Sequence, residues 1–230
     1  MYGKKLGRKI DAMNEVSIGP GAYFVISDVL VATIDPTKQE EVVVFEPSYP
    51  CYYDHIQYAG GVVKGAPLDL VDGKWVLNPE SFRKALSPKT KVFIFNNAQN
   101  PTGKIFTREE METIASILEE FPNVVVLSDE VYDFLTFDGQ QFVPFASIGD
   151  NFNKTVTVYS GGKLFNATGW KCGWGIGPAQ IMKAAGILTY SSIYCSNTPV
   201  QVAMSKSLSK IETPGYKDGA SYVTSVCNEF

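Results

Sequence analysis

The chain has 230 residues, of which 45% are hydrophobic and 19% charged, and its formal net charge is −4. This composition is typical of a globular protein that buries a core as one large domain or two small ones. The slight acidic excess provides no basic field for nucleic acid or for an anionic membrane, so we expect neither as a partner. No run of about 18 apolar residues predicts a membrane span, and no apolar run near the N-terminus predicts a secretory signal.

Cysteine and histidine usage narrows the chemistry further. The four cysteines lack the spacing of a metal site or of a disulfide framework, which favours reduced thiols in a cytoplasmic protein. His55 is the only histidine, which argues against a histidine-dependent triad and against a multi-histidine metal site. We interpret His55 as a residue of a helix surface or as an interior histidine with satisfied hydrogen bonds.

Strand and helix patterns alternate along the chain. Predicted helices span 23–33, 49–59, 79–86, 107–120, 179–188 and 199–211. Predicted strands span 42–45, 62–63, 91–96, 124–127, 155–159 and 172–176. The helix 107–120 has the clearest start, because Thr107 and Glu110 have the spacing of a capping box. Short apolar strands that alternate with helices predict a mostly parallel sheet covered on both faces, as in a three-layer α/β/α sandwich.

Two features precede or begin the first predicted helices. The turn Gly19-Pro20-Gly21 lies just before the helix 23–33, where free backbone amides and small residues suit a bound phosphate. A glycine-rich turn alone is weak evidence, and neither a Walker-type motif nor a G-x-G-x-x-G fingerprint occurs in the right context. Tyr49 follows a strand and is placed to stack on a planar ring, although core packing is the more common role of a tyrosine.

Asn100 and Asp129 follow the strands 91–96 and 124–127. The residues around Asn100 have the composition of a tight turn, which is the simpler interpretation. The side-chain amide of Asn100, like the Tyr132 hydroxyl, is also suited to donate a hydrogen bond to a phenolic oxygen. A carboxylate at a buried strand end is costly unless it is paired, and a protonated pyridine nitrogen is a suitable partner for Asp129. A helix cap or a structural ion pair is the alternative for Asp129. We expect Glu130 to face a structural partner.

Lys163 is the most informative residue, in the run Ser160-Gly161-Gly162-Lys163 after the β-branched strand 155–159. Most lysines are solvated surface charges, but a lysine after a buried strand is not typical of a surface helix. Its amine is suited to form an imine with an aldehyde cofactor, while Ser160 and Lys171 hold an anionic group beside it. Pyridoxal phosphate has both an aldehyde and a phosphate.

Asn100, Asp129 and Lys163 each follow the carboxyl end of a predicted strand. In open α/β sheets, ligands bind beyond the carboxyl ends of the strands. The three positions therefore predict one shared site.

Together these motifs resemble the fold-type I aminotransferases of class I/II, most closely the kynurenine aminotransferase and cysteine-S-conjugate β-lyase branch. The resemblance runs through essentially the whole chain. The motifs that carry it are Asn100-Pro101-Thr102-Gly103-Lys104, Ser128-Asp129-Glu130-Val131-Tyr132, and Ser160-Gly161-Gly162-Lys163 with Gly169-Trp170-Lys171.

The resemblance implies a pyridoxal 5′-phosphate enzyme with catalytic residues Lys163, Asp129 and Tyr132. Lys163 would be the Schiff-base lysine and proton carrier, and Asp129 would pair with the pyridinium nitrogen. Asn100 and Tyr132 would bind the phenolic oxygen, and Tyr49 would stack on the ring. The phosphate would be held by Gly21, Ala22, Ser160 and Lys171.

The resemblance also implies that the chain corresponds to roughly the middle half of a family member. Residues 1–211 would form the cofactor-binding large domain, incomplete at its N-terminus. Residues 212–230 would be a linker and the start of a truncated C-terminal small domain. The N-terminal arm and the arginine that grips the substrate carboxylate would be missing, since Arg8, Arg83 and Arg108 do not occupy that position.

The expected reaction moves an amino group between an aromatic or kynurenine-like amino acid and a 2-oxo acid, with β-lyase side activity on cysteine conjugates. The resemblance implies a homodimer. The alternative is a truncated chain that binds pyridoxal phosphate but is catalytically weak or inactive, acting as a fragment or partner subunit. A third possibility is an α/β domain that binds another anionic ligand.

Overall fold

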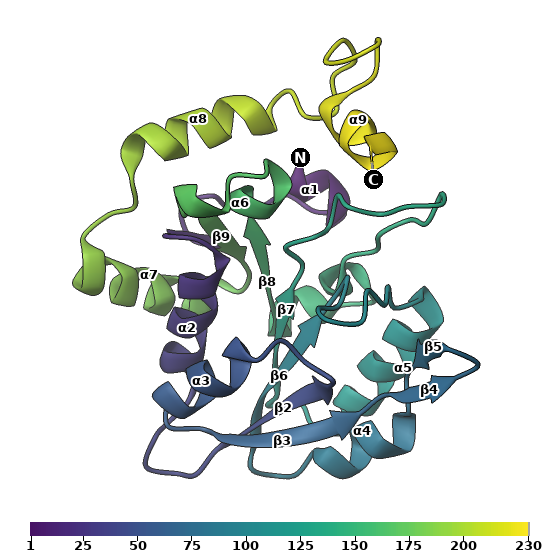
Figure 1. Ribbon diagram of the computed structural model, residues 1–230. Coiled ribbons are helices and arrows are strands. Elements are labelled where there is room, and N and C mark those ends of the chain that lie inside the picture. The colour runs from purple at the N-terminus through teal and green to yellow at the C-terminus, as the bar shows by residue number, and fades with distance from the viewer. Residues whose placement is uncertain (230) are drawn as a thin grey trace.

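The computed structural model describes residues 1–229 and is built around one seven-stranded sheet (Figure 1). The strands lie in the order β1-β9-β8-β7-β6-β2-β3. Strand β9 pairs antiparallel with β1 and β8, and the other pairs are parallel, which confirms the predicted mostly parallel sheet. The strand bounds are Val16–Gly19 (β1), Glu41–Glu46 (β2), Val62–Pro67 (β3), Thr90–Asn96 (β6), Val125–Asp129 (β7), Thr155–Ser160 (β8) and Gly173–Ile176 (β9).

Helices cover both faces of the sheet (Figure 1). The helix bounds are Tyr2–Lys5 (α1), Ala22–Thr33 (α2), Cys51–Tyr58 (α3), Pro79–Ala85 (α4), Arg108–Glu119 (α5), Gly161–Leu164 (α6), Ala179–Ile193 (α7), Thr198–Leu208 (α8) and Tyr222–Glu229 (α9). Helices α2, α3 and α7 pack on one face, and α4 and α5 pack on the other. Within residues 1–229 no helix combines the length and the apolar character that crossing a membrane requires.

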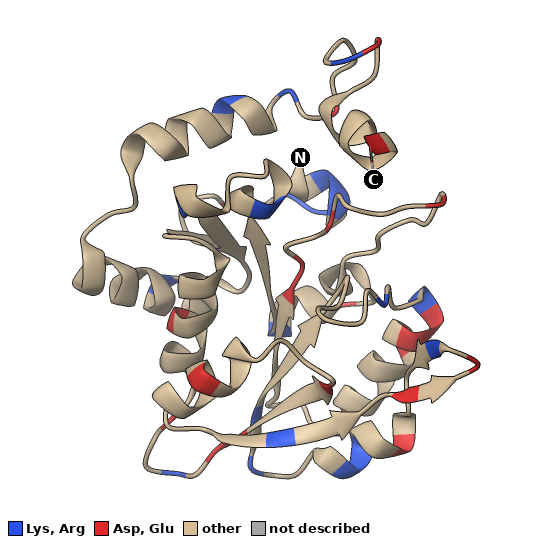
Figure 2. Cartoon of the chain, viewed as in Figure 1, with Lys and Arg blue, Asp and Glu red and all other residues tan. Residues whose placement is uncertain are grey.

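Alternate side chains of the central strands enter two separate cores. Val42 and Val44 of β2 pack against α2 and α3, whereas Val43 and Phe45 pack against α4 and α5. Because both faces of the strand are buried, the sequence is continuously apolar instead of alternating. The central strands carry few charges, which lie mainly on helices and loops (Figure 2). This arrangement confirms the predicted α/β/α sandwich.

The predicted capping box at the start of α5 is present. Thr107 Oγ1 accepts a hydrogen bond from Glu110 N at 3.2 Å, and Glu110 Oε2 accepts one from Thr107 N at 2.9 Å. Glu110 also pairs with Lys104 Nζ at 2.7 Å and accepts a hydrogen bond from Leu77 N at 3.0 Å. The cap thus joins α5 to two loops as well as closing its own first turn.

Several element boundaries differ from the prediction. Helix α3 begins at Cys51 rather than Tyr49, α7 continues to Ile193, and α8 ends at Leu208. Strand β1 and the hairpin of β4 (Asp69–Val71) and β5 (Lys74–Val76) were not predicted. Strand β1 is only four residues long and contains a serine and a glycine, so it has no clear apolar pattern.

Helix α9 lies in residues 212–230, which we expected to be a linker and the start of a small domain. It packs on the main body, because Val223 contacts a small core formed by Phe134, Leu164 and Ile211. Cys227 Sγ also donates to the Phe134 carbonyl oxygen at 3.4 Å. The assignment of residues 212–230 to a second domain stays a prediction.

Candidate active site

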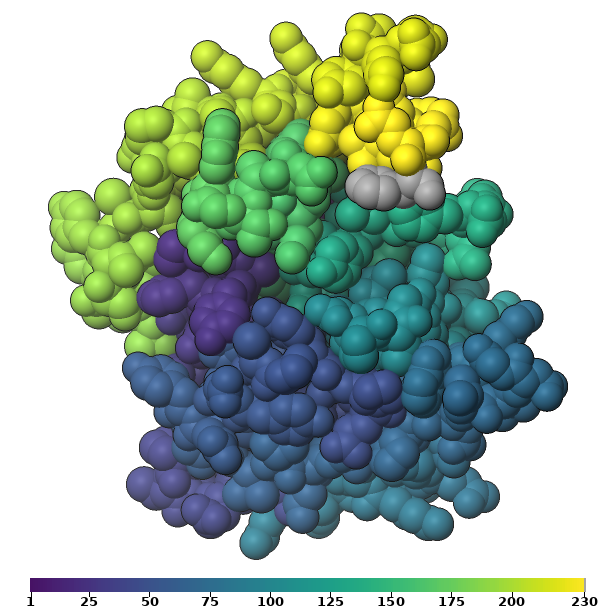
Figure 3. Space-filling model, in the orientation of Figure 1, coloured from purple at the N-terminus to yellow at the C-terminus, as the bar shows by residue number. Residues whose placement is uncertain are grey.

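One cavity of about 160 Å³ opens beyond the carboxyl ends of β6, β7 and β8. Segments that are far apart in the sequence meet on the face shown in Figure 3: α2 in purple, α3 in blue, the segments after β6 and β7 in teal, and α6 in green. All nine residues selected from the sequence line this cavity: Gly21, Ala22, Tyr49, Asn100, Asp129, Tyr132, Ser160, Lys163 and Lys171. Their individual roles stay predictions.

Asp129, the last residue of β7, is a buried carboxylate in the cavity wall. Its Oδ2 accepts a hydrogen bond from the Tyr52 hydroxyl at 2.6 Å, and Oδ1 accepts a long one of 3.4 Å from Val131 N. Burial raises the pKa of Asp129 to about 6, although these hydrogen bonds and the charge of Lys163 act in the opposite direction. Among the described residues it forms no salt bridge. A cationic ligand atom is therefore the partner that this carboxylate lacks.

Asn96 fixes the positions of Asp129 and Asn100. It is the last residue of β6 and lies opposite Asp129 in the parallel pairing of β6 with β7. Its Nδ2 donates to the Asp129 carbonyl oxygen at 2.9 Å, and its Oδ1 accepts from Asn100 N at 2.7 Å. One side chain thus holds the start of the Asn100 turn against the end of β7.

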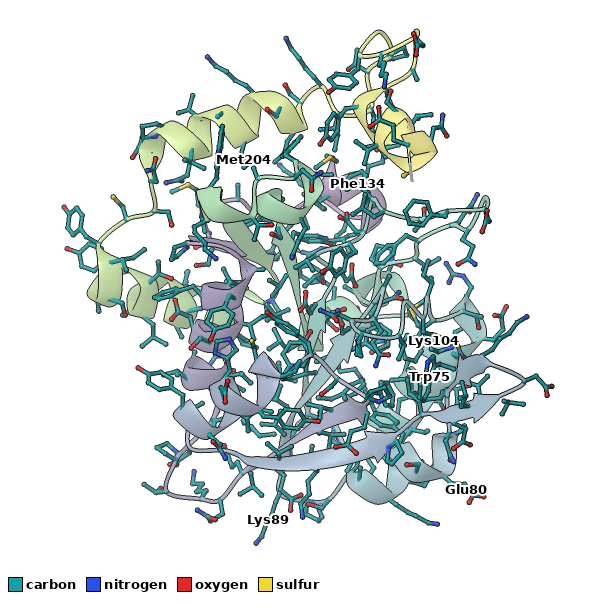
Figure 4. The ribbon with its side chains drawn as sticks, viewed as in Figure 1. Trp75, Glu80, Lys89, Lys104, Phe134 and Met204 are labelled. Carbon is teal, nitrogen blue, oxygen red and sulfur yellow. The ribbon has the colours of Figure 1, made fainter. Side chains whose placement is uncertain are left out.

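Lys163 is held by the short helix α6 directly after β8. Ser160 caps this helix, since its Oγ accepts a hydrogen bond from Lys163 N at 3.2 Å. Lys163 Nζ lies 5.8 Å from the centre of the Tyr132 ring. The two glycines before Lys163 allow close packing: a Cβ on Gly161 would lie 2.8 Å from Sδ of Met204, which α8 contributes (Figure 4), and a Cβ on Gly162 would lie 2.9 Å from a backbone carbon of Thr168.

The N-terminus of α2 forms the opposite wall. Gly21 precedes the helix with φ of 90°, a conformation that favours glycine. Within residues 1–229 the first-turn amides of Ala22 and Tyr23 donate to no backbone oxygen. The Lys171 side chain runs beside Gly21, with its Cδ 3.8 Å from where a Gly21 Cβ would be. Free amides, the helix dipole and a lysine together suit an anion.

The cavity is also lined by residues that the sequence analysis did not identify. Tyr52 is the clearest of these, since it lies three residues after Tyr49, on the same face of a helix that was predicted. That spacing was the signal by which it could have been found. The other additional lining residues are Tyr23, Ile26, His55, Asn96, Val131, Gly162, Thr168 and Cys172.

The sequence also led to expectations about the surroundings of Glu130 and His55. Glu130 faces away from the cavity and accepts hydrogen bonds from Ser128 Oγ at 2.8 Å and Phe145 N at 2.9 Å, as expected for a structural role. The interpretation of His55 was wrong. It is only 5% exposed and lines the cavity, and its Nε2 has no hydrogen-bond partner in the described part of the chain.

Comparison with known sequences gives one consistent picture. The chain is 36% identical over 214 residues to kynurenine--oxoglutarate transaminase 1 of Rattus norvegicus, covering 89% of this chain and 50% of that protein. It is 36% identical over 234 residues to kynurenine--oxoglutarate transaminase of Dictyostelium discoideum, covering 95% of this chain and 52% of that protein. The chain therefore spans about half the length of these curated relatives.

Solved structures show the same fold. An N-succinyldiaminopimelate aminotransferase from Mycobacterium tuberculosis matches with a TM-score of 0.89 and 30% identity, over 99% of this chain and 56% of that one. An aromatic aminotransferase from Pyrococcus horikoshii OT3 matches with a TM-score of 0.86 and 28% identity, over 99% and 57%. The sequence model for aminotransferase class I and II matches residues 3–216. The chain belongs to the aminotransferase class I and II family.

Proposed function

We propose that the cavity binds pyridoxal 5′-phosphate and that the protein transfers an amino group between an amino acid and a 2-oxo acid. The observation that carries the proposal is that Lys163, Asp129 and the N-terminus of α2 line one cavity. The names of the relatives favour kynurenine or another aromatic amino acid as the donor.

The residues present fit this cofactor. The buried Asp129 lacks a cationic partner among the described residues, and a protonated ring nitrogen supplies one. The amides of Ala22 and Tyr23, with Ser160 and Lys171, suit the phosphate. These donors and the acid belong to different walls of one cavity, as an elongated ligand with a cationic ring and an anionic tail requires.

Tyr49 also fits as the aromatic residue against the ring. Cys51 and partial burial raise the pKa of Tyr49 to about 12, so its hydroxyl stays neutral at ordinary pH. A neutral phenol offers a flat apolar face for stacking. The Tyr49 ring meets the Tyr52 ring edge to face, with centroids 5.6 Å apart, which restricts its orientation.

When bound, pyridoxal phosphate supplies a reactive aldehyde and a ring that accepts electrons. Asp129 would stay ionised beside a cationic ring nitrogen, because that positive charge would oppose the effect of burial on the pKa of Asp129. Asn100 and Tyr132 are in the cavity wall to donate hydrogen bonds to the phenolic oxygen. Lys163 Nζ would hold the aldehyde carbon, and its free amine would be the base that accepts the substrate α-proton.

The same proton removal supports β-elimination from cysteine conjugates, which we include as a side activity. We also infer a cytoplasmic homodimer with the large domain at residues 1–211. The support for a second subunit is an exposed apolar face on α7, where Ile187 is 65% exposed and Tyr190 is 59% exposed.

A weaker enzyme is the second candidate, and the arginines favour it. Arg8 pairs with Glu15, Arg83 with Glu120 and Arg108 with Glu112. None of these arginines lines the cavity. The described residues therefore offer no guanidinium for bidentate binding of a substrate carboxylate, and a chain that binds pyridoxal phosphate with little turnover is the alternative.

The test is cofactor attachment followed by a half-reaction. After incubation with pyridoxal phosphate, borohydride reduction should leave a stable adduct that peptide mass spectrometry places on Lys163. Lys163→Ala should abolish the adduct, and Lys183→Ala, at an exposed lysine of α7, should not. An adduct spread over surface lysines would refute the proposal.

The half-reaction distinguishes the two candidates. Adding kynurenine or phenylalanine to the loaded protein should shift its visible absorbance as the amino group is transferred. An adduct at Lys163 without this spectral shift would favour the weakly active chain.

A further inference from the structure

His55 has surroundings that the proposed chemistry does not use. It lies on α3 and lines the same cavity as Ala22, Ser160 and Lys171. Its side chain is buried, and Nε2 has no hydrogen-bond partner within residues 1–229. A buried polar atom without a partner is unfavourable, so a ligand that accepts a hydrogen bond from it gains stability.

The aromatic neighbour of His55 belongs to the anion cradle, the site formed by the first turn of α2 and Lys171. The rings of His55 and Tyr23 lie edge to face with centroids 4.1 Å apart, and Tyr23 is the second residue of α2. A contact between an imidazole N–H and an aromatic face is much weaker than a hydrogen bond to a charged oxygen. Tyr23 is 50% exposed, so its ring can turn aside without disturbing the core. The Nε2 donor is thus available to a stronger acceptor.

The charges of the cavity identify the kind of acceptor. The α2 amides and Lys171 favour an anion at this wall, and an anion needs donors. Burial lowers the pKa of His55, and the nearby Asp54 only partly offsets this, which favours a neutral imidazole near neutral pH. A phosphate group close to the ring would favour its protonated form, in which both nitrogens are donors.

We propose that His55 is an anion-binding residue, and that its Nε2 donates a hydrogen bond to the phosphate group held at the first turn of α2. The inference rests on the proposed function only for the identity of the ligand as a phosphate ester. It adds to the predicted phosphate ligands a side chain from α3, and it gives a reason for the buried histidine.

Histidine-selective ¹⁵N labelling tests the proposal in the unmodified protein. Because His55 is the only histidine, its two ring nitrogens give the only labelled signals. Titration with inorganic phosphate should move the Nε2 signal toward that of a hydrogen-bonded donor, and pyridoxal phosphate should do the same. Unchanged signals at saturating phosphate would overturn the proposal.

Variants at His55 provide an independent measurement. His55→Phe keeps a ring against Tyr23 but removes the donor, and it should weaken pyridoxal phosphate binding roughly tenfold or more. His55→Gln keeps a donor and should retain most of the affinity. Tyr58→Phe, on the same helix and 79% exposed, is the matched control. Pyridoxal lacks the phosphate, so its affinity should be the same in all four proteins.

The outcomes separate this inference from the proposed function. If Lys163 forms the adduct and His55→Phe binds pyridoxal phosphate as tightly as the natural protein, the inference is wrong and the proposed function stands. If phosphate moves the His55 signal but no adduct forms, the anion site stands and the proposed cofactor does not. An equal loss of affinity for pyridoxal and for its phosphate would show a general packing defect and would also overturn the inference.

Discussion

Asp129 and Glu130 are adjacent buried acids with different surroundings. Burial raises the pKa of Asp129 to about 6 and that of Glu130 to about 8. Side chains of successive strand residues point to opposite faces, so Glu130 shares a side with Ser128, its hydrogen-bond donor, while Asp129 enters the cavity. Asp129 is therefore the acid whose ionised form a cationic ligand atom can stabilise.

The raised pKa of Asp129 predicts a stability change that depends on pH. With an ordinary value of 3.8, the ionised carboxylate destabilises the native state increasingly as the pH rises from about 4 to about 6, and the cost then stays constant. We expect Asp129→Asn to raise the free energy of unfolding of the cofactor-free protein by up to about 3 kcal/mol near pH 8, because about two pKa units are worth roughly that much. Urea unfolding near pH 8 and pH 4 measures this.

The lower pH provides the control for this prediction. Near pH 4 the native carboxyl is already mostly protonated, so the substitution should change the free energy of unfolding little. Asparagine keeps an oxygen for the Tyr52 hydroxyl, so the packing of the site is preserved. Equal stabilisation at both pH values would show that charge is not the cause.

Polar residues at strand ends were predictable because their positions follow from the chain pattern. Asn100, Asp129 and Lys163 each come after an apolar run, and parallel strands bring those ends together. Tyr52 was missed although its spacing from Tyr49 was a usable signal, whereas the place of His55 in the cavity depends on which face of α3 meets the sheet. The hydrogen bond from Tyr52 to Asp129 joins residues 77 positions apart, and no local pattern indicates it.

The junction of β9 with α2 positions the anion cradle. A Cβ on Gly173 would lie 2.3 Å from the Ala22 amide nitrogen and 2.5 Å from the Gly21 carbonyl carbon. These are backbone atoms of the first turn of α2, so an added methyl group has to displace the turn itself. The close approach of β9 thus requires glycine at this position.

We therefore expect Gly173→Ala to weaken pyridoxal phosphate binding at least about tenfold and to lower the free energy of unfolding by about 1–3 kcal/mol. Absorbance titration and urea unfolding measure the two effects. Gly169→Ala is the matched control, since no atom lies within 4 Å of its added methyl group. Similar losses in both variants would contradict the assigned role of the β9 contact.

The start of α5 shows how one side chain connects several segments. Glu110 closes the capping box, pairs with Lys104 and accepts a hydrogen bond from Leu77 N. The side chains of Lys104 and Trp75 are labelled in Figure 4. Thr107→Ala removes only the cap and should lower the free energy of unfolding by about 1 kcal/mol. Glu110→Ala also leaves the mostly buried Lys104 amine unpaired and should cost more, about 3 kcal/mol. Thermal unfolding that ranked the two variants in the opposite order would contradict this reading.

Strands that are buried on both faces were predictable from the sequence. Strands β2 and β6 are buried on both faces and read as continuous apolar runs. Strand β1 was missed because its stability comes from pairing with β9, which is more than 150 residues away. The hairpin of β4 and β5 had a usable signal, since Asp72-Gly73 is a typical two-residue turn and both residues have positive φ.

The whole molecule brings five distant segments around one cavity, and motif spacing alone cannot establish this arrangement. The predicted sheet gives the correct edge for β6, β7 and β8, but the α2 wall depends on β1 and β9. Because those two strands run in opposite directions, the parallel-sheet rule does not place α2. The position of the anion cradle therefore follows only from the three-dimensional arrangement of β1, β9 and α2.

The exposed face of α7 predicts self-association of the whole protein. Ile187, Tyr190 and Tyr194 are more than half exposed, and α7 and α8 show few charged residues in Figure 2. Exposed apolar faces of this kind mark contact surfaces. We expect the natural protein to sediment as the proposed dimer and the double variant Ile187→Glu and Tyr190→Glu as a monomer, because unpaired carboxylates oppose burial of the face. Lys183→Glu, on an exposed part of the same helix, is the control. A double variant that sediments as the natural protein does would place the subunit contact elsewhere.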